Sequence, residues 1–336
     1  MLNNSGKIRW GIMGTGWIAE QFAADLAYTD NAELLAVGSR TSDSAGAFAA
    51  KFSVPRAYGS YEELVQDQDV DAVYIATPHP LHRDNVLLSL RAGKAVLCEK
   101  PFTINGAELE ELIKAARKDK LFLMEAMWTR FLPPIRQVRE WLKDGRIGEA
   151  RLVKADFGFR SGWNPEGRLL NLELGGGALL DAGIYPVSFA SMIFGAEPEQ
   201  IHSTAHIGET GVDEQFSVLL TYEGGKSASL NGAIRLGLTN EAYIFGTEGY
   251  IHIPSFLNAT SASLHVQGEE PVHFKDDRKE KGYAFEAYEV GKCLLEGRLE
   301  SDIIPLDESL AIMKLLDRIR EPWGLKYPSE SQETAI

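Results

Sequence analysis

The sequence has few cysteines, no long uninterrupted apolar run and fewer basic than acidic residues. Its two cysteines, Cys98 and Cys293, lie far apart and have no metal-binding spacing, so neither a disulfide framework nor a metal site is expected. No apolar stretch reaches the roughly 20 residues that a membrane span requires, and the first residues lack the apolar core of a signal peptide. We therefore expect a cytoplasmic protein that does not bind a membrane.

The excess of acidic residues gives a formal net charge of -14. Nucleic acid is not an expected partner, because phosphate binding requires a basic face. The 336 residues exceed what one ordinary core needs, and 44% hydrophobic with 24% charged residues is typical of a globular protein. Length and composition therefore favour two domains.

The first 125 residues alternate between short apolar runs and helical stretches. Runs such as RWGIM, AVYIAT and AVLCE are separated by segments such as WIAEQFAADLAY. Continuous apolar runs indicate strands buried on both faces, as in a parallel sheet between two helix layers. The pattern predicts an α/β domain over residues 1–125, with a doubly wound parallel sheet.

The pattern changes in the rest of the chain. From Ala150 onwards, longer segments such as ARLVKADFGF and QFSVLLTYEG show partial alternation and are divided by turns. Such alternation is typical of an antiparallel sheet with one covered face. Two helical segments follow, YAFEAYEVGKCLLEG and LDESLAIMKLLDRIRE. We predict a second, α+β domain over residues 126–336, with a large, mostly antiparallel open sheet.

The first strand runs into a glycine-rich turn with the spacing of a dinucleotide-binding loop. Gly14 permits the tight turn, and Gly16 lets the backbone approach a pyrophosphate closely. The diphosphate is then expected on the free N–H groups at the start of the following helix. The predicted cofactor-binding residues of this turn are Gly14, Thr15, Gly16, Trp17 and Ile18.

The end of the second predicted strand bears on the choice between NAD and NADP. An NAD-specific fold usually places Asp or Glu there to accept from the ribose 2′-hydroxyl. This chain has Ser39, Arg40 and Thr41, and its nearest acid is Asp43. A guanidinium and hydroxyls suit a 2′-phosphate, so NADP is favoured and NAD is the alternative cofactor. Alternatively, Arg40 is an ordinary surface arginine with no role in binding.

Two later strand ends are expected to face the nicotinamide, because ligands bind outside the carboxyl ends of parallel strands. Two histidines there resemble metal ligands, but no third ligand has a suitable spacing, so helix capping or cofactor contact is favoured. Lys100 follows a buried strand and precedes a proline, and a salt bridge to Glu99 is its alternative role. The predicted cofactor-binding residues are Thr77, Pro78, His79, His82, Glu99 and Lys100.

A glycine triplet, 175–177, precedes a helical segment that carries Asp181 and Tyr185. Oxidation of a carbinol needs a base for the hydroxyl proton, and Tyr185 suits that role if a nearby lysine ammonium lowers its pKa below about 10. Asp181 lies one helical turn earlier and can orient a second hydroxyl. We predict catalytic roles for Lys100, Asp181 and Tyr185. Alternatively, Asp181 caps the helix and Tyr185 packs at an interface.

Three further side chains are candidates for a substrate pocket. Trp128 and Arg130 follow the last strand of the first predicted domain, and Trp163 lies in the loop RSGWNPEGRLL. Aromatic walls and a cation are suited to a sugar, although Trp residues are as often core or interface anchors.

Several of these segments together resemble the Gfo/Idh/MocA oxidoreductases, and most closely their branch of dihydrodiol and D-xylose dehydrogenases. The matching segments are GIMGTGWIA, ATPHPLH, EKP, EAMWTRFLPP and GGGALLDAGIYP. The resemblance implies a Rossmann domain, NADP or NAD as cofactor, and homodimers or dimers of dimers formed through the second sheet. It also implies roles for Lys100 and Tyr185, and it places Arg168 and Tyr283 near the cofactor.

The substrate class implied by the resemblance is a sugar, polyol or cyclic diol, with hydride exchanged at a carbinol or carbonyl carbon. Two alternatives remain open. Some relatives of this fold bind the cofactor without turnover and act as regulatory sensors. The same residues also serve, in reverse, a reductase of an anhydro- or keto-sugar.

Overall fold

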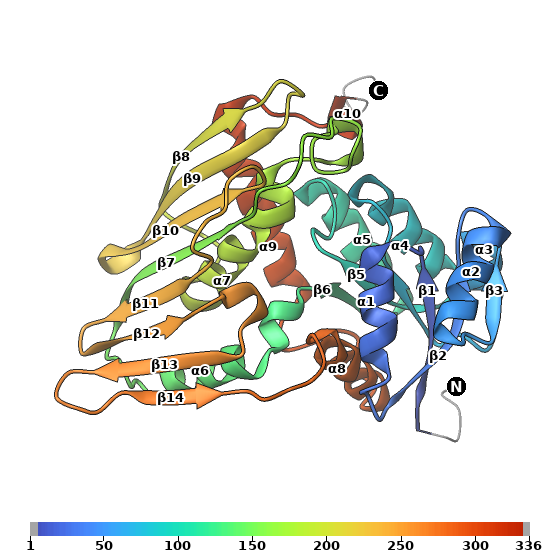
Figure 1. Ribbon diagram of the computed structural model, residues 1–336, viewed down its shortest axis with the longest axis horizontal. Helices are drawn as coiled ribbons and strands as arrows, with labels where there is room; N and C mark the ends of the chain where they lie inside the picture. The colour runs from blue at the N-terminus through green and yellow to red at the C-terminus, as the bar shows by residue number, and fades with distance from the viewer. Residues whose placement is uncertain (1–5, 332–336) are drawn as a thin grey trace. The chain divides into compact units, whose positions relative to one another are not determined.

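The computed structural model describes residues 6–331 and divides the chain into two compact units. Unit 1 comprises Met1–Thr103, Ala107–Trp128 and Lys279–Leu310. Unit 2 comprises Ile104–Gly106, Thr129–Arg278 and Ala311–Ile336. Figure 1 shows the elements of both units in chain order.

Unit 1 contains a parallel sheet of six strands in the order β3-β2-β1-β4-β5-β6. This confirms the predicted doubly wound α/β fold, and the order reverses between β1 and β4, where such folds bind dinucleotides. The strands are β1 (Ile8–Met13), β2 (Ala32–Gly38), β3 (Arg56–Tyr58), β4 (Ala72–Ile75), β5 (Ala95–Glu99) and β6 (Leu123–Ala126).

Two helices of unit 1, α2 and α3, begin where a polar side chain accepts a hydrogen bond from a free backbone N–H group. Thr41 Oγ1 accepts a hydrogen bond from Ser44 N (3.2 Å), and Ser60 Oγ accepts one from Glu63 N (3.1 Å). The helices are α1 (Trp17–Leu26), α2 (Ser42–Phe52), α3 (Tyr61–Gln66), α4 (His82–Arg91), α5 (Gly106–Asp119) and α8 (Tyr283–Leu295), with the start of α9 (Leu306–Arg320).

Helix α8 belongs to unit 1, whereas the sequence placed all of residues 126–336 in the second domain. The carboxylate of Asp25 on α1 caps the start of α8. Asp25 Oδ2 accepts hydrogen bonds from Gly282 N (2.8 Å) and Tyr283 N (2.9 Å). A carboxylate at a helix N-terminus also interacts favourably with the helix dipole. The first compact unit therefore includes Lys279–Leu310 in addition to most of the predicted N-terminal domain.

Unit 2 contains an eight-stranded sheet in the order β14-β13-β12-β11-β7-β10-β9-β8. The β7–β10 pair is parallel and the other neighbours are antiparallel, which confirms the predicted mostly antiparallel sheet. The strands are β7 (Ala150–Gly158), β8 (Gln200–Ile207), β9 (Asp213–Tyr222), β10 (Lys226–Ala233), β11 (Ala242–Gly246), β12 (Gly249–Ile253), β13 (Ser261–Val266) and β14 (Val272–Lys275).

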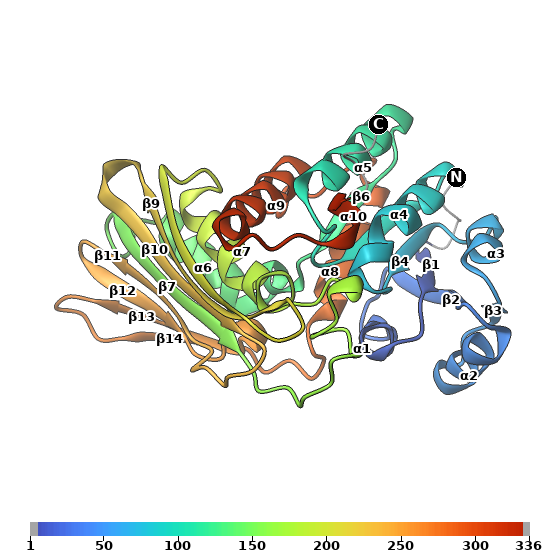
Figure 2. The same cartoon turned by 90° about the horizontal axis from the view of Figure 1, so that it is seen from above.

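In Figure 2 the helices of unit 2 run along one face of this sheet. They are α6 (Pro133–Lys143), α7 (Ile184–Phe194) and the end of α9; unit 2 also contains the short α10 (Pro328–Ser331). Side chains on the covered face, such as Val153, Leu230 and Ile244, are fully buried. Their neighbours on the opposite face, which we call the outer face, are half-buried or exposed. Period-two alternation therefore assigns each strand residue to one face.

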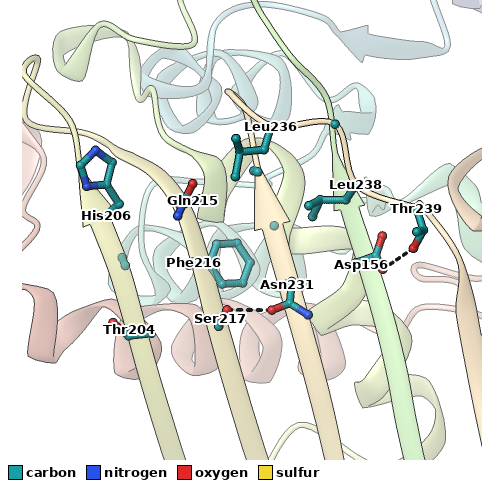
Figure 3. Close-up of a pocket in the computed structure, with 14 residues that line it drawn as sticks. Asp156, Thr204, His206, Gln215, Phe216, Ser217, Asn231, Leu236, Leu238 and Thr239 are labelled. Carbon is teal, nitrogen blue, oxygen red and sulfur yellow. Dashed lines mark hydrogen bonds between the residues drawn. The ribbon is translucent and has the colours of Figure 1, made fainter.

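A groove of about 680 Å³ lies where β7, β8 and β10 end and β9 begins. Two hydrogen bonds join polar side chains along it, from Ser217 Oγ to Asn231 Oδ1 (2.7 Å) and from Thr239 Oγ1 to Asp156 Oδ2 (2.8 Å), as Figure 3 shows. Leu236, which also lines the groove, is 45% exposed. The outer face therefore combines paired polar groups with exposed apolar side chains.

The segment Leu172–Phe194 is long and apolar enough to match a membrane span, whereas the sequence predicted no apolar stretch of that length. Its most apolar 18-residue window has a mean hydropathy of 1.4, and 83% of that window is buried inside the protein. Such burial is typical of a core helix, because a membrane-spanning helix exposes apolar side chains to lipid.

Candidate active site

The glycine turn of unit 1 has the backbone geometry of a phosphate cradle. Gly14 has φ +108°, and a Cβ atom there would lie 2.9 Å from the carbonyl oxygen of Ala76, so only glycine fits. Gly16 directly precedes α1, and a Cβ on it would meet no atom within 4 Å. The open space before the helix N-terminus is where a diphosphate binds. The following Trp17 is 66% exposed.

The end of β2 presents a guanidinium that suits a 2′-phosphate. Arg40 is exposed, and no carboxylate in residues 6–331 forms an ion pair with it. Ser39 Oγ lies 3.4 Å from Thr15 Oγ1, which connects this strand end to the glycine turn. Thr41, by contrast, uses its hydroxyl to cap α2. Arg40 and Ser39 therefore fit the adenosine end of NADP, whereas the hydroxyl of Thr41 serves the fold.

The ring of His82 joins the chain segments that follow β4 and β5. Its Nδ1 lies 2.9 Å from the carbonyl oxygen of Pro101, and its Nε2 lies 2.8 Å from that of Thr77. Burial lowers the pKa of His82 from its ordinary value. Asn85 Nδ2 donates to Thr77 Oγ1 (3.0 Å), so Thr77 is held from two sides. His82 is fully buried, and these contacts join the two strand ends; its predicted cap or cofactor contact stays a prediction.

The other two residues of this segment differ in exposure. Pro78 is exposed, whereas His79 is 9% exposed and lies edge-on to His82 at 5.7 Å between ring centroids. Within residues 6–331, no group of three His, Cys, Asp or Glu side chains has the arrangement of a metal site.

Glu99 and Lys100 stand at the end of β5. The carboxylate of Glu99 is buried and accepts hydrogen bonds from the Tyr74 hydroxyl and, at 3.2 Å, from the backbone N of Lys100. Burial and the charge of Glu99 raise the pKa of Tyr74 well above its usual value. The Lys100–Pro101 peptide bond is cis. Glu99 therefore fixes the backbone that presents Lys100 at the carboxyl edge of the sheet, where a nicotinamide is expected.

Trp128 and Tyr283 come together although the chain separates them widely. Their ring centroids lie 4.8 Å apart, and both side chains are almost fully buried. Tyr283 opens α8, so Asp25 fixes its backbone as well. The family resemblance places Tyr283 near the cofactor, and Tyr283 belongs to the same compact unit as the glycine turn and Lys100.

In unit 2, Asp181 and Tyr185 lie on a helix of changing geometry. Leu179–Gly183 forms a π-helix that continues as α7 from Ile184. The sequence predicted an ordinary α-helix in which Pro186 cannot donate to the carbonyl of Ala182. A π-turn widens the helix at this position, and such turns are frequent at functional sites.

An ion pair holds Asp181, and an aromatic ring holds Tyr185. Arg168 Nη1 donates to Asp181 Oδ1 at 2.7 Å. The ring of Tyr185 meets that of Phe157 edge-to-face, with 5.6 Å between centroids. We did not single out Phe157 from the sequence, although alternation along β7 places it on the covered face with Val153 and Ala155. Arg168 was expected near the cofactor, and the structure pairs it with a predicted catalytic residue.

The two remaining pocket candidates of unit 2 have different surroundings. Arg130 is 2% exposed, and its guanidinium donates to Ser188 Oγ (3.0 Å) and to the Ser188 carbonyl oxygen (2.7 Å). Arg130 therefore binds α7 through Ser188, a contact that the sequence did not indicate. Trp163 is 51% exposed. The guanidinium carbon of Arg235 lies over its ring, 5.5 Å from the centroid of the Trp163 ring.

Sequence profiles of known families match most of the chain. The profile described as an oxidoreductase family with an NAD-binding Rossmann fold matches residues 8–127. The C-terminal domain profile of the same family, GFO/IDH/MocA, matches residues 135–252. The two matches correspond to the parallel sheet and to most of the antiparallel sheet.

Full-length similarities agree with these matches. The chain is 43% identical over 333 residues to trans-1,2-dihydrobenzene-1,2-diol dehydrogenase of Mus musculus, covering 97% of this chain and 99% of the relative. Two solved structures are also similar. Each match covers 94% of this chain and 97% of the solved chain. One is a 3-ketoreductase from Actinomadura kijaniata with NADP and TDP-benzene (TM-score 0.84, 30% identity). The other is an aldose-aldose oxidoreductase from Caulobacter crescentus with glycerol (TM-score 0.85, 26% identity). This chain belongs to the Gfo/Idh/MocA family and is an NAD(P)-binding oxidoreductase of the dehydrogenase type.

Proposed function

We propose that this enzyme exchanges a hydride between NADP and a carbinol or carbonyl carbon of a sugar, polyol or cyclic diol. The observation that carries the proposal is the buried pair of Asp181, in the π-helix Leu179–Gly183, and Tyr185, at the start of α7, with Arg168 bound to Asp181. The names of the relatives support the substrate class: one acts on a dihydrodiol, and the others on keto and aldose substrates.

The chemistry assigns separate tasks to the side chains. When bound, the nicotinamide supplies the hydride acceptor or donor. Tyr185 takes the proton of the reacting hydroxyl during oxidation and returns it during reduction. Asp181 accepts a hydrogen bond from a second hydroxyl of the substrate, and Arg168 holds its carboxylate in place. Lys100 supplies a positive charge that stabilises an oxyanion during proton transfer.

NADP is the proposed cofactor because of Arg40. The guanidinium is exposed at the end of β2 and has no carboxylate partner in residues 6–331, so it is available to a 2′-phosphate. The similar 3-ketoreductase structure contains NADP, in agreement with this proposal.

A substrate panel tests the proposal. Purified protein is assayed for NADPH formation with dihydrodiols, aldoses and polyols, and for NADPH consumption with the corresponding carbonyl compounds, each also with NAD. We expect turnover with at least one diol or sugar and a preference for NADP. Tight cofactor binding without turnover in either direction would instead favour the non-catalytic sensor.

We also propose that the enzyme acts as a homodimer, or a dimer of dimers, in which a second copy covers the outer face of the unit 2 sheet. Supporting features are the stacked ring pairs Tyr243–His252 (4.3 Å) and Tyr250–His265 (4.4 Å), and Leu219, which is 42% exposed. Exposed apolar groups gathered on a sheet face mark an interaction surface. Light scattering should give at least twice 37.1 kDa, and Leu219→Lys should shift it towards one chain. A single-chain mass for the unmodified protein would contradict the assembly.

A further inference from the structure

The glycine triplet before the π-helix is held by two buried side chains from distant parts of unit 2. Asp213, at the start of β9, is fully buried, and its Oδ2 accepts a hydrogen bond from Leu179 N at 2.7 Å. Tyr327 is 1% exposed, and its hydroxyl donates to the carbonyl oxygen of Gly176 at 2.9 Å. Both contacts are made at the start of the segment that carries Asp181 and Tyr185.

Gly177 shows how closely the carboxylate of Asp213 approaches this backbone. Its φ is +126°, and a Cβ atom there would lie only 2.3 Å from Asp213 Oδ1. The carboxylate thus occupies the space that a side chain at residue 177 would fill. The neighbouring Gly176 is equally confined, because a Cβ on it would lie 2.7 Å from the carbonyl oxygen of Leu169. Close contacts from Asp213 and from the carbonyl oxygen of Leu169 therefore confine the backbone at the start of the π-helix.

We propose that Asp213 is a positioning residue that sets the π-helical segment Leu179–Gly183, and through it Asp181 and Tyr185, for proton transfer. The inference rests on the proposed function of Tyr185. A carboxylate on a free helix N–H group makes a charge-assisted hydrogen bond, which is roughly twice as strong as a neutral one. It also compensates the positive end of the helix dipole. A small displacement of this start moves Tyr185, and a misplacement of about 1 Å can cost up to about 100-fold in rate.

The surroundings of Asp213 make this contact sensitive to pH. Burial raises the pKa of Asp213 to about 7, and the backbone N–H groups of Leu179 and Ala178 and the charge of Arg320 oppose that rise. Tyr327 is the other ionisable group facing it, and burial together with the charge of Asp213 raises the pKa of that phenol well above its usual value. The carboxylate therefore ionises near neutral pH, and the hydrogen bond to Leu179 strengthens as it does so.

The test uses Asp213→Asn in the full-length enzyme, with Glu214→Gln as its control. Asn keeps the shape of Asp but cannot ionise. Glu214 neighbours Asp213 on β9, and its carboxylate lies 4.0 Å from Arg235, away from the glycine triplet. Three quantities are measured: kcat and KM for NADP, the pH profile of kcat, and amide hydrogen exchange over residues 175–190.

For Asp213→Asn we expect a fall in kcat of roughly tenfold with KM for NADP unchanged. A step near pH 7 in the profile of the unmodified enzyme should disappear, and exchange over residues 175–190 should quicken. Glu214→Gln should behave as the unmodified protein. An Asn variant that keeps the step and the exchange rates would overturn the proposal.

A second variant covers the case in which Asp213→Asn does not fold. Tyr327→Phe removes the other anchor without removing the titrating carboxylate, so exchange over residues 175–190 should quicken while the step near pH 7 stays. If exchange over residues 175–190 in that variant, corrected for its intrinsic pH dependence, did not slow as the pH rises through about 7, the proposal would be overturned. The exchange measurement needs no turnover. If Tyr185→Phe remained fully active, the proposed role of Tyr185 would fail, while the exchange result would still decide whether Asp213 fixes the π-helix.

Discussion

Arg168 Nη1 lies 2.7 Å from Asp181 Oδ1, and this ion pair joins an exposed loop to a buried helix. The side chain of Arg168 is 55% exposed, whereas that of Asp181 is 7% exposed. An ion pair with one exposed partner contributes little to stability, of the order of 0–1 kcal/mol. Its importance therefore lies in where it holds the Asp181 carboxylate.

Arg168→Met tests this relationship. The loop arginine is exposed enough for its loss to leave the melting temperature almost unchanged, but Asp181 then loses a charged partner that fixes its rotamer. We expect KM for the substrate to rise severalfold with little change in the affinity for NADP. Asp181→Asn should abolish the effect of the Arg168 substitution, because a double-mutant cycle then has no pair left to break. Additive effects of the two substitutions would contradict a functional pair.

Arg40→Asp tests the cofactor proposal. The substitution places a carboxylate where a 2′-phosphate is expected, so NADP binding should weaken by roughly 1–3 kcal/mol, the scale of a lost charge-assisted hydrogen bond. NAD binding should improve or stay unchanged. Fluorescence titration of both cofactors measures the effect. Equal affinity of the unmodified protein for NAD and NADP would contradict the proposal.

Lys100→Met should keep the fold and most of the cofactor affinity but lose turnover. Glu99 fixes the backbone at residue 100 through a hydrogen bond to its N–H group, and that contact does not involve the lysine side chain. One charge-stabilising group typically contributes about 10²- to 10⁴-fold to the rate. Steady-state kinetics beside a cofactor titration separates the two effects. A nearly unchanged kcat would exclude the role.

Much of the fold was predictable because its signals are local. Gly14 and Gly16 show their function in their spacing, and the apolar runs of the first domain identify a parallel sheet without any knowledge of contacts. Alternation likewise identifies the strands of the second sheet. Lys100, Asp181 and Tyr185 stand out because their residue types are unusual at a strand end and on an apolar helix.

Long-range contacts were not predictable in this way. The carboxylate of Asp25 caps the start of α8, and nothing in the sequence around residue 25 marks it as the cap of a helix near residue 283. The same holds for Arg130, whose buried guanidinium donates to the carbonyl oxygen of Ser188 on α7. The π-turn at Leu179–Gly183 was also not predicted, because Pro186 indicates only that one regular helical hydrogen bond, to the carbonyl of Ala182, is missing.

Tyr185→Phe tests the proposed acid/base. Phe keeps the ring and its edge-to-face contact with Phe157 but cannot move a proton. We expect kcat to fall by roughly 100-fold or more, with little change in NADP affinity and melting temperature. Tyr185→His should retain measurable activity, with the pH profile moved towards the imidazole range near about 6.5. Full turnover by the Phe variant would mean that the proton leaves through another group.

The burial of Asp213 predicts how stability depends on pH. Its pKa is about 7 in the folded protein, whereas a solvated aspartate ionises with a pKa of about 3.9. Between these values the folded state holds a proton that the unfolded state has released. The contribution of this group is therefore fully present below about pH 4 and is lost as the pH rises through about 7. The slope cannot exceed about 1.4 kcal/mol per pH unit for one proton.

Asp213→Asn removes this proton while leaving every other titrating group in place, so the difference between the two proteins isolates it. Urea unfolding at a series of pH values should show the unmodified protein losing stability relative to the Asn variant as the pH rises towards about 8. Because the sequence pI is about 5.1, the series is best kept above about pH 5.5 to preserve solubility. Parallel stability curves would mean that Asp213 is already ionised throughout this range, and its contact with Leu179 would then be insensitive to pH. A difference in the free energy of unfolding that grows with pH would show that the proton which stabilises the fold also weakens the contact of Asp213 with Leu179.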